Sequence, residues 1–243
     1  TGTKIGCREG DCGACTVLVG ELDGDEMKYR QITSCLTPIG NVANKHVVSI
    51  EGLNMDELSP VQQAMVDEGG TQCGFCTVGF VVSLSGFCLS QDAPTQQKAI
   101  EAIDGNICRC TGYKSIERAA DKITHLLEEK DSDSRIAWLV KKEFIPTYFN
   151  TIPDKIKSLV ESDGVEAPQK LIGGGTDLYV QQHEKLVDLE VDLISNMPSL
   201  KGIVVNGNQC KVGAGVTVTE LMESESIKSI FPDFLKHAKL VSS

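Results

Sequence analysis

Residues 1–55 contain short apolar and β-branched runs instead of a helical repeat. The runs at 16–19, 28–33 and 47–50 predict β-strands, and the residues over 20–25 predict a turn between the first two. The first part of the chain is therefore expected to be a small β-rich domain.

Residues 56–128 change to a helical period. Ser59-Pro60 precedes spaced apolar residues, which is typical of a helix start, and Gly69-Gly70 is expected to end that helix. A second helix is expected in an apolar run, and the last has apolar positions close to every 3.6 residues. The helices after the first are predicted at 77–89, 96–103 and 113–129. Four helices in this length predict a small bundle.

The charged residues at 128–135 lack apolar positions, and we predict a linker over 129–142. From residue 143 the pattern becomes mixed. A helix is expected at 152–160 and a further helix at 217–224. Between them, strands are expected at 171–172, 187–194, 202–205 and 211–212.

Composition supports packed domains and excludes some partners. The chain has 243 residues, of which 41% are hydrophobic, which suits one large domain or two to three small ones. The formal net charge of −11, with no basic stripe, disfavours nucleic acid and anionic membrane surfaces as partners. No apolar run approaches the roughly 20 residues needed to span a bilayer.

The ten cysteines are concentrated in the first 110 residues, where nine of them lie. Disulfides, zinc and iron–sulfur clusters are the three alternatives. Cys7, Cys12, Cys15 and Cys35 form C-x4-C-x2-C with a distant fourth cysteine, which is the plant-type [2Fe–2S] pattern. Zinc sites usually use two C-x2-4-C knuckles, so this triple is a poor match for zinc. We expect Gly6, Gly10 and Gly13 to adopt positive φ and to let N–H groups approach the sulfurs.

A second set of four cysteines follows in two short pairs. Cys73 and Cys76 form CxxC, and Cys108 and Cys110 form CxC about thirty residues later. Alone, this set indicates a metal; beside the first set, it indicates a second [2Fe–2S] cluster. Both pairs are expected in loops at helix ends.

The remaining candidate residues are assigned to packing. Cys88 and Cys210 lie in apolar stretches and are expected to be buried free thiols. Trp138 is expected to be a packing anchor. The four histidines share no close spacing, so metal binding is not expected at His46, His125, His183 or His237. No G-x-S-x-G nucleophile motif is present.

Three consecutive glycines follow the strand expected at 171–172. Gly173, Gly174 and Gly175 could let backbone N–H groups surround an anion, although a flexible turn is the alternative. The run is neither G-x-G-x-x-G nor a P-loop, which disfavours a Rossmann site.

The cysteine sets together, in this order, resemble the molybdenum hydroxylase family, which includes xanthine dehydrogenase and aldehyde oxidase. The segments that carry the resemblance are 2–17, 72–77 and 105–113. One departure is Val78, where many members have proline; it removes no ligand. The resemblance implies an α+β multidomain fold. It consists of a β-grasp [2Fe–2S] domain at 1–55, a four-helix [2Fe–2S] domain at 56–128 and a vanillyl-alcohol-oxidase-like FAD-binding domain at 143–243. We expect the first domain to lack its beginning and the third its end.

The resemblance also implies roles for single residues. The Cys7 set would hold the cluster nearer the flavin, and the Cys73 set the cluster nearer a molybdopterin. Gln72 and Cys110 would approach the pterin, although an ordinary capping or loop amide is the alternative for Gln72. The FAD loop would consist of Leu171, Ile172, Gly173, Gly174, Gly175, Thr176 and Asp177.

The partners implied are a molybdopterin-binding large subunit and NAD, in a cytoplasmic dimer of heteromers. The expected function is transfer of electrons from molybdopterin through two [2Fe–2S] clusters to FAD and NAD during xanthine or hypoxanthine oxidation. Aldehyde, nicotinate or aromatic-heterocycle oxidation on the same scaffold stays open, and so does a zinc-binding structural module. No catalytic residue is expected in this chain.

Overall fold

The computed structural model describes residues 2–90, 93–128, 134–160, 171–186, 191–207 and 209–240. The chain divides into two compact units. Unit 1 contains Thr1–Leu36 and Val42–Gly164, and unit 2 contains Thr37–Asn41 and Val165–Ser243. Within the described residues, no helix is long and apolar enough to cross a membrane.

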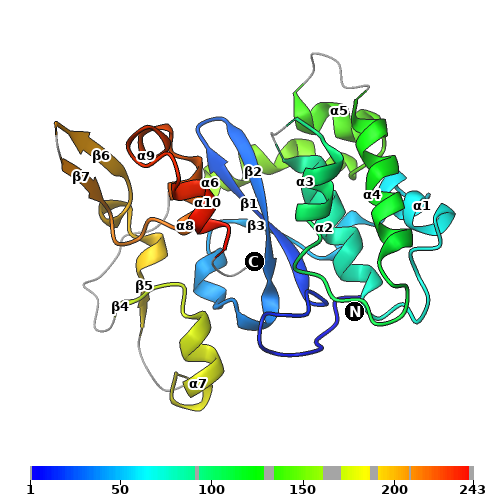
Figure 1. Ribbon diagram of the computed structural model, residues 1–243, viewed down its shortest axis with the longest axis horizontal. Helices are drawn as coiled ribbons and strands as arrows, with labels where there is room; N and C mark the ends of the chain where they lie inside the picture. The colour runs from blue at the N-terminus through cyan, green and yellow to red at the C-terminus, as the bar shows by residue number, and fades with distance from the viewer. Residues whose placement is uncertain are drawn as a thin grey trace. The chain divides into compact units, whose positions relative to one another are not determined.

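A three-stranded antiparallel sheet forms the first part of unit 1 (Figure 1). β1 (Thr16–Asp23) pairs with β2 (Glu26–Thr33) as a hairpin and with β3 (His46–Val48) along its other edge. The expected turn over 20–25 is shorter in the structure, because the strand continues through Gly20. A Cβ atom at Gly20 would lie 2.4 Å from the Tyr29 ring, so glycine is needed there for close packing inside the hairpin.

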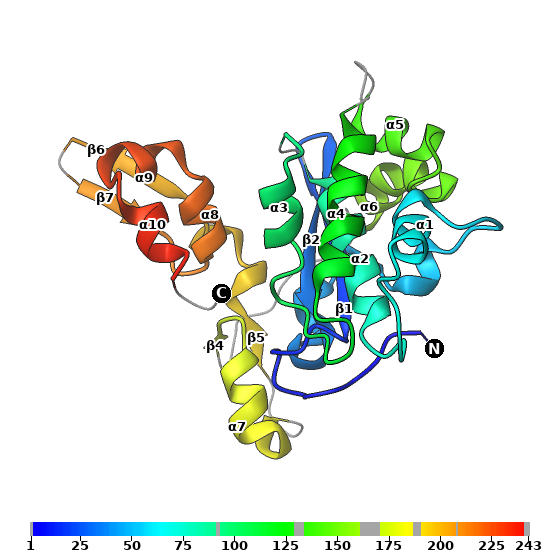
Figure 2. The same ribbon diagram turned by 45° about the vertical axis from the view of Figure 1, so that its right-hand side comes forward.

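Four helices follow and pack at one side of this sheet (Figures 1 and 2). They are α1 (Pro60–Asp67), α2 (Thr77–Leu89), α3 (Gln96–Glu101) and α4 (Lys114–Leu127). The helix start predicted at Ser59-Pro60 is confirmed, and it carries a capping box in which Ser59 Oγ accepts from Gln62 N and the Gln62 side chain accepts from Ser59 N. The bundle predicted from the 3.6-residue period is confirmed.

Helix α2 is the centre of unit 1, and residues 79–89 are all buried. Gly79 and Gly86 are seven residues apart and so share a face. A Cβ at Gly86 would lie 2.9 Å from Leu18 of β1 and 2.8 Å from Gln31 of β2. Gly86 therefore lets α2 lie close to the sheet, and Gly79 lets it lie close to the cysteine loop that precedes β1.

The structure differs from the sequence expectation after residue 133. Residues 129–133 of the expected linker lie outside the described part, but Arg135–Lys141 form helix α5. Trp138 is 1% exposed, as its expected packing role requires. The 3-10 helix η4 (Thr147–Thr151) and α6 (Ile152–Val160) also join this core through Phe149, Ile152 and Ile156. Residues 143–160 therefore pack with the cysteine-bearing part, because their apolar side chains are buried against it.

Unit 2 contains two small sheets and short helices. β4 (Leu171–Ile172) pairs in parallel with β5 (Asp192–Leu193), and β6 (Ile203–Asn206) pairs antiparallel with β7 (Gln209–Val212). The first half of the strand expected at 187–194 lies outside the described residues. The helices are α7 (Thr176–Leu186), α8 (Val218–Glu223), α9 (Glu225–Ile230) and α10 (Phe234–Ala238). The other 3-10 helices in the described residues of both units are η1 (Ser34–Leu36), η2 (Ile39–Val42), η3 (Ile50–Leu53), η5 (Ile194–Asn196) and η6 (Pro198–Leu200).

Candidate cofactor-binding loops

The first cysteine set lies in the loop before β1 and in η1 after β2. Gly10 and Gly13 have φ of 81° and 67°, as expected. Gly6 is not in the left-handed region. A Cβ at Gly6 would lie 3.0 Å from Cys12 Sγ, so the loop passes close to this sulfur. Arg8, with φ of 61°, supplies a left-handed position that the sequence did not reveal.

Backbone amides of this loop point at the sulfurs. Glu9 N donates to Cys7 Sγ at 3.3 Å, and Cys35 N donates to Cys15 Sγ at 3.4 Å. Burial alone would raise the pKa of Cys7, but hydrogen bonds, chiefly from the Glu9 and Cys12 backbone, lower it to about 7. Burial and then a hydrogen bond to Cys15 raise the pKa of Cys35 to about 11. A loop that donates N–H groups to thiolates is suited to an anionic cluster.

The second cysteine set lies at the helix ends predicted for it. Cys76 is the residue before α2, and Cys108 and Cys110 lie in the loop before α4. Thr111 N donates to Cys108 Sγ at 3.4 Å, and Cys108 N donates to the Tyr113 hydroxyl at 2.9 Å. Gly112 and Tyr113 both have φ of 67°, which turns the chain sharply between Cys110 and the helix.

The sulfurs of the second set also show opposite pKa shifts within pairs. The Phe75 backbone amide and then the Cys110 thiol lower the pKa of Cys73, while donation to Cys73 raises that of Cys110. Burial and then donation to Cys108 raise the pKa of Cys76 to about 12. Cys73 and Cys110 are exposed, whereas Cys108 is buried.

The eight cysteines are all free, and their pKa shifts show that the thiols influence one another in pairs. The pairs are Cys7 with Cys12, Cys15 with Cys35, Cys73 with Cys110, and Cys76 with Cys108. In the part of the chain that the structure describes, no group of three or more His, Cys, Asp or Glu residues could hold a single metal ion. A two-iron core takes two thiolates on each iron, and two pairs per set match that number.

The two remaining cysteines differ in burial. Cys88 is fully buried in α2, as expected, and burial raises its pKa to about 12. Cys210 is only half-buried, because it lies in the two-stranded β6–β7 sheet. His46 packs among the rings of Tyr29, Tyr148 and Phe149, which is the packing role expected for it.

Two features of the cysteine loops were missed by the sequence reasoning. Asn106 is 4% exposed, and its side chain contacts the first cysteine loop and Ser83 of α2. Ser83 is itself buried among apolar residues. A serine inside an otherwise apolar helix, and an asparagine just before CxC, were the signals that could have identified this contact.

The candidate FAD loop joins β4 to α7 in unit 2. Leu171 and Ile172 form β4, Thr176 and Asp177 begin α7, and the three glycines lie between them. A Cβ at Gly173 or Gly174 would meet nothing within 4 Å, and Gly175 has φ of 78°. The glycines therefore leave open space at the N-terminus of a helix, where backbone N–H groups favour a phosphate.

Gln72, the residue expected to approach a pterin, lies in unit 1. It is exposed and stands beside the exposed Cys73.

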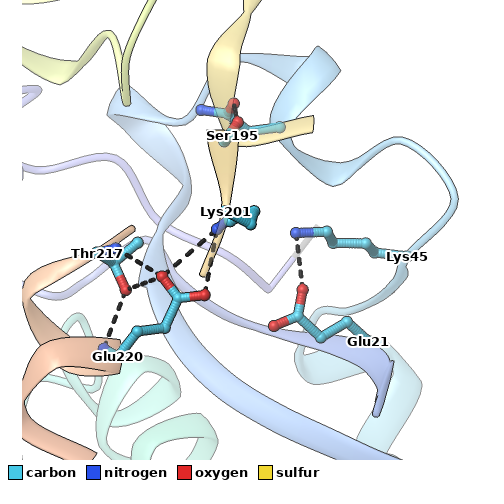
Figure 3. A network of polar contacts seen from close by, with 7 residues as sticks. Glu21, Lys45, Ser195, Lys201, Thr217 and Glu220 are labelled. Atoms are coloured by element: carbon cyan, nitrogen blue, oxygen red, sulfur yellow. Dashed lines mark hydrogen bonds and ion pairs between the residues drawn. The ribbon is translucent and has the colours of Figure 1, made fainter. Parts of the chain in front are cut away.

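Polar contacts hold this part of unit 2 together. Asn41 Nδ2 donates to Gly174 O at 3.1 Å, and Ser195 Oγ donates to Asn41 Oδ1 at 2.6 Å. Farther along, the Glu220 carboxylate accepts from Thr217 Oγ1 at 2.8 Å and pairs with Lys201 at 3.2 Å (Figure 3). Thr217 and Glu220 form a capping box at the start of α8.

Three protein-family models match the chain in succession. A 2Fe-2S iron-sulfur cluster binding domain matches residues 1–40 and a [2Fe-2S] binding domain matches 49–121. The FAD binding domain in molybdopterin dehydrogenase matches 147–243. These matches confirm the fold class and the presence of [2Fe–2S]-binding and FAD-binding domains.

Several relatives share most or half of this chain. Xanthine dehydrogenase of Emericella nidulans is 29% identical over 91% of this chain and 20% of its own length. Xanthine dehydrogenase 1 of Arabidopsis thaliana is 44% identical over 48% of this chain and 9% of its own, and aldehyde oxidase 1 of Cavia porcellus is 42% identical over the same shares. The chain thus spans a fifth or less of these relatives.

Among solved structures, quinoline 2-oxidoreductase from Pseudomonas putida 86 is 34% identical. The match covers 53% of this chain and 76% of that chain, with a TM-score of 0.45.

The three family models and the xanthine dehydrogenase and aldehyde oxidase relatives identify the chain as part of an oxidoreductase. It belongs to the molybdenum hydroxylase family and carries that family's [2Fe–2S]-binding and FAD-binding domains.

Proposed function

We propose that this chain is the electron-transfer subunit of a cytoplasmic molybdenum hydroxylase. It would connect a molybdopterin site on a partner chain with FAD and NAD. The observation that carries the proposal is the arrangement of two four-cysteine sets in one unit, each with N–H groups aimed at its sulfurs. When bound, a [2Fe–2S] cluster would accept and release one electron at a time.

The pairing of sulfurs supports a specific ligand set. Cys7 and Cys12 would bind one iron of the first cluster, and Cys15 and Cys35 the other. In the second cluster, Cys73 and Cys110 would share one iron, leaving Cys76 and Cys108 for the other. The exposed Cys73, Cys110 and Gln72 would face the molybdopterin-binding subunit.

The glycine loop supports the proposed flavin site. The N–H groups of Gly173 to Gly175 and the Thr176 hydroxyl would hold the FAD pyrophosphate, with Leu171 and Ile172 placing the loop at the end of β4. Asp177, in the first turn of α7, would lie beside it. NAD as the acceptor is supported by the relatives that are named dehydrogenases.

We propose xanthine or hypoxanthine as the substrate of the whole enzyme, which we expect to be a dimer of heteromers. Aldehyde oxidation is the second candidate, because an aldehyde oxidase is almost as similar over the cysteine-bearing half as a xanthine dehydrogenase is. Nicotinate and other aromatic heterocycles would be served by the same scaffold.

Two experiments test the proposal. Metal and sulfide analysis of the purified chain should give iron with an equal amount of acid-labile sulfide; zinc without sulfide would refute the electron-transfer function. The complex with its molybdenum-binding chain should reduce NAD in the presence of xanthine. Reduction by an aldehyde but not by xanthine would replace the first substrate with the second.

A further inference from the structure

Asn106 connects the loops that carry the two cysteine sets. Its Nδ2 donates to Gly13 O at 3.0 Å and lies 3.5 Å from Thr16 Oγ1. Its Oδ1 accepts from Ser83 Oγ at 2.7 Å. The carboxamide thus joins the first loop to α2 from a position two residues before Cys108.

A backbone contact runs beside this side chain. Ile107 N donates to Cys12 O at 3.0 Å, so one hydrogen bond and short covalent segments connect a cysteine of each set. The approach is close because Gly13 and Gly79 carry no Cβ atom. A Cβ at Gly13 would lie 2.3 Å from Gly105 O, and one at Gly79 would lie 2.3 Å from Gly13 O.

We propose that Asn106 is a positioning residue that fixes the separation and relative orientation of the two [2Fe–2S] sites. The proposal rests on the proposed function, in which the two cysteine sets bind clusters. Leaving a buried polar group without its partner is unfavourable. Displacing either loop would break the bonds of the Asn106 carboxamide, so the arrangement seen here is favoured over any that separates the loops.

The consequence is a fixed coupling between the sites. Electronic and magnetic interactions between two clusters weaken steeply with distance, and here Asn106 holds the Ile107–Cys12 connection in place. Ser83 acts on the same carboxamide from the other side. Removing the Ser83 hydroxyl leaves the Asn106–Gly13 bond intact, so its effect should be smaller than that of replacing Asn106.

The test is electron paramagnetic resonance of the full chain with both clusters reduced by dithionite. The wild type should show splitting and faster spin relaxation from interaction between the two reduced clusters. Asn106→Leu should lose a large part of the splitting, and Ser83→Ala a smaller part. Thr124→Val is the matched control, because it removes a buried hydrogen bond to Ala120 O that stays within α4. It should lower stability without changing the splitting.

Each result decides one of the two proposals. An unchanged splitting in an Asn106→Leu protein with full iron and sulfide would overturn the positioning role. So would the absence of any interaction in a wild type that contains both clusters. If Asn106→Leu fails to assemble, Ser83→Ala decides, and an unaltered spectrum there would overturn the role. A wild-type protein without iron–sulfur signals would instead refute the proposed function.

Discussion

The close contact between α2 and the first cysteine loop makes Gly79→Ala the most informative single change. A Cβ at this position would lie 2.3 Å from Gly13 O and 2.8 Å from Asn106 Nδ2. The obstacle is a backbone oxygen that already accepts from Thr16 N at 3.1 Å and from Thr16 Oγ1 at 2.6 Å. The helix or the loop must therefore move.

Two opposing effects set the size of the change. Alanine is favoured over glycine inside a helix by about 1 kcal/mol. Overpacking costs about 1–3 kcal/mol, and a held carbonyl places this site at the upper end. We expect Gly79→Ala to lower the free energy of unfolding of unit 1 by about 2 kcal/mol, the difference between these terms.

Two further substitutions calibrate the prediction. In Gly86→Ala the obstacles are side-chain atoms of Gln31 and Leu18 and no backbone atom, so the cost should be smaller than at Gly79. Gly105 is exposed, and a Cβ there meets nothing within 4 Å. Gly105→Ala should therefore stay within about 0.5 kcal/mol of the wild type, as surface changes usually do.

The assay is urea denaturation followed by tryptophan fluorescence. Trp138 is the single tryptophan of the chain and is buried in the core that contains α2, so it reports the unfolding of unit 1. If Gly79→Ala proves as stable as Gly86→Ala, the contact between α2 and the cysteine loop is not as close as the structure shows, and the reasoning fails.

Three other predictions follow from the structure. Cys108→Ser should reduce iron and labile sulfide to about half, whereas Cys88→Ser should retain both, because Cys88 is a buried thiol of the core; equal losses would contradict the assignment. Burial lowers the pKa of His46 to about 4, below its unfolded value of about 6.5. The stability that the neutral imidazole contributes to the folded state is therefore present above pH 6.5 and is lost as the pH falls towards 4. Since His46 is only half-buried, that loss should be about 1–2 kcal/mol after discounting for solvent screening, measured by urea titration, and His46→Gln should flatten the pH dependence. Thr217→Ala should destabilise α8 by about 1 kcal/mol in hydrogen exchange, with the Trp138 transition unchanged, because the cap lies in unit 2.

Periodicity and spacing predicted most of the elements of unit 1. The helix expected at 77–89 matches α2, because an apolar run of this length is longer than a typical buried strand. The helix over Arg135–Lys141 was missed because charged residues precede it and its apolar side is short. What distinguishes it from a linker is the burial of Trp138 and Leu139, which depends on distant residues of the core and leaves no local pattern.

The candidate sites show the same division between local and distant information. The cysteine spacings predicted two ligand sets, since closely spaced thiolates followed by more distant ones are typical of a [2Fe–2S] site. The contact between the sets could not be predicted in this way, because Gly13 and Asn106 are 93 residues apart and neither spacing refers to the other. Their contact depends on Gly13, on Gly79 and on Ser83, the last two inside helix α2. A glycine and a buried serine each weaken an apolar helix when considered locally, and both are explained by the approach of the two loops. Residues that oppose their local pattern were thus the best guide to the contact between the two cysteine sets.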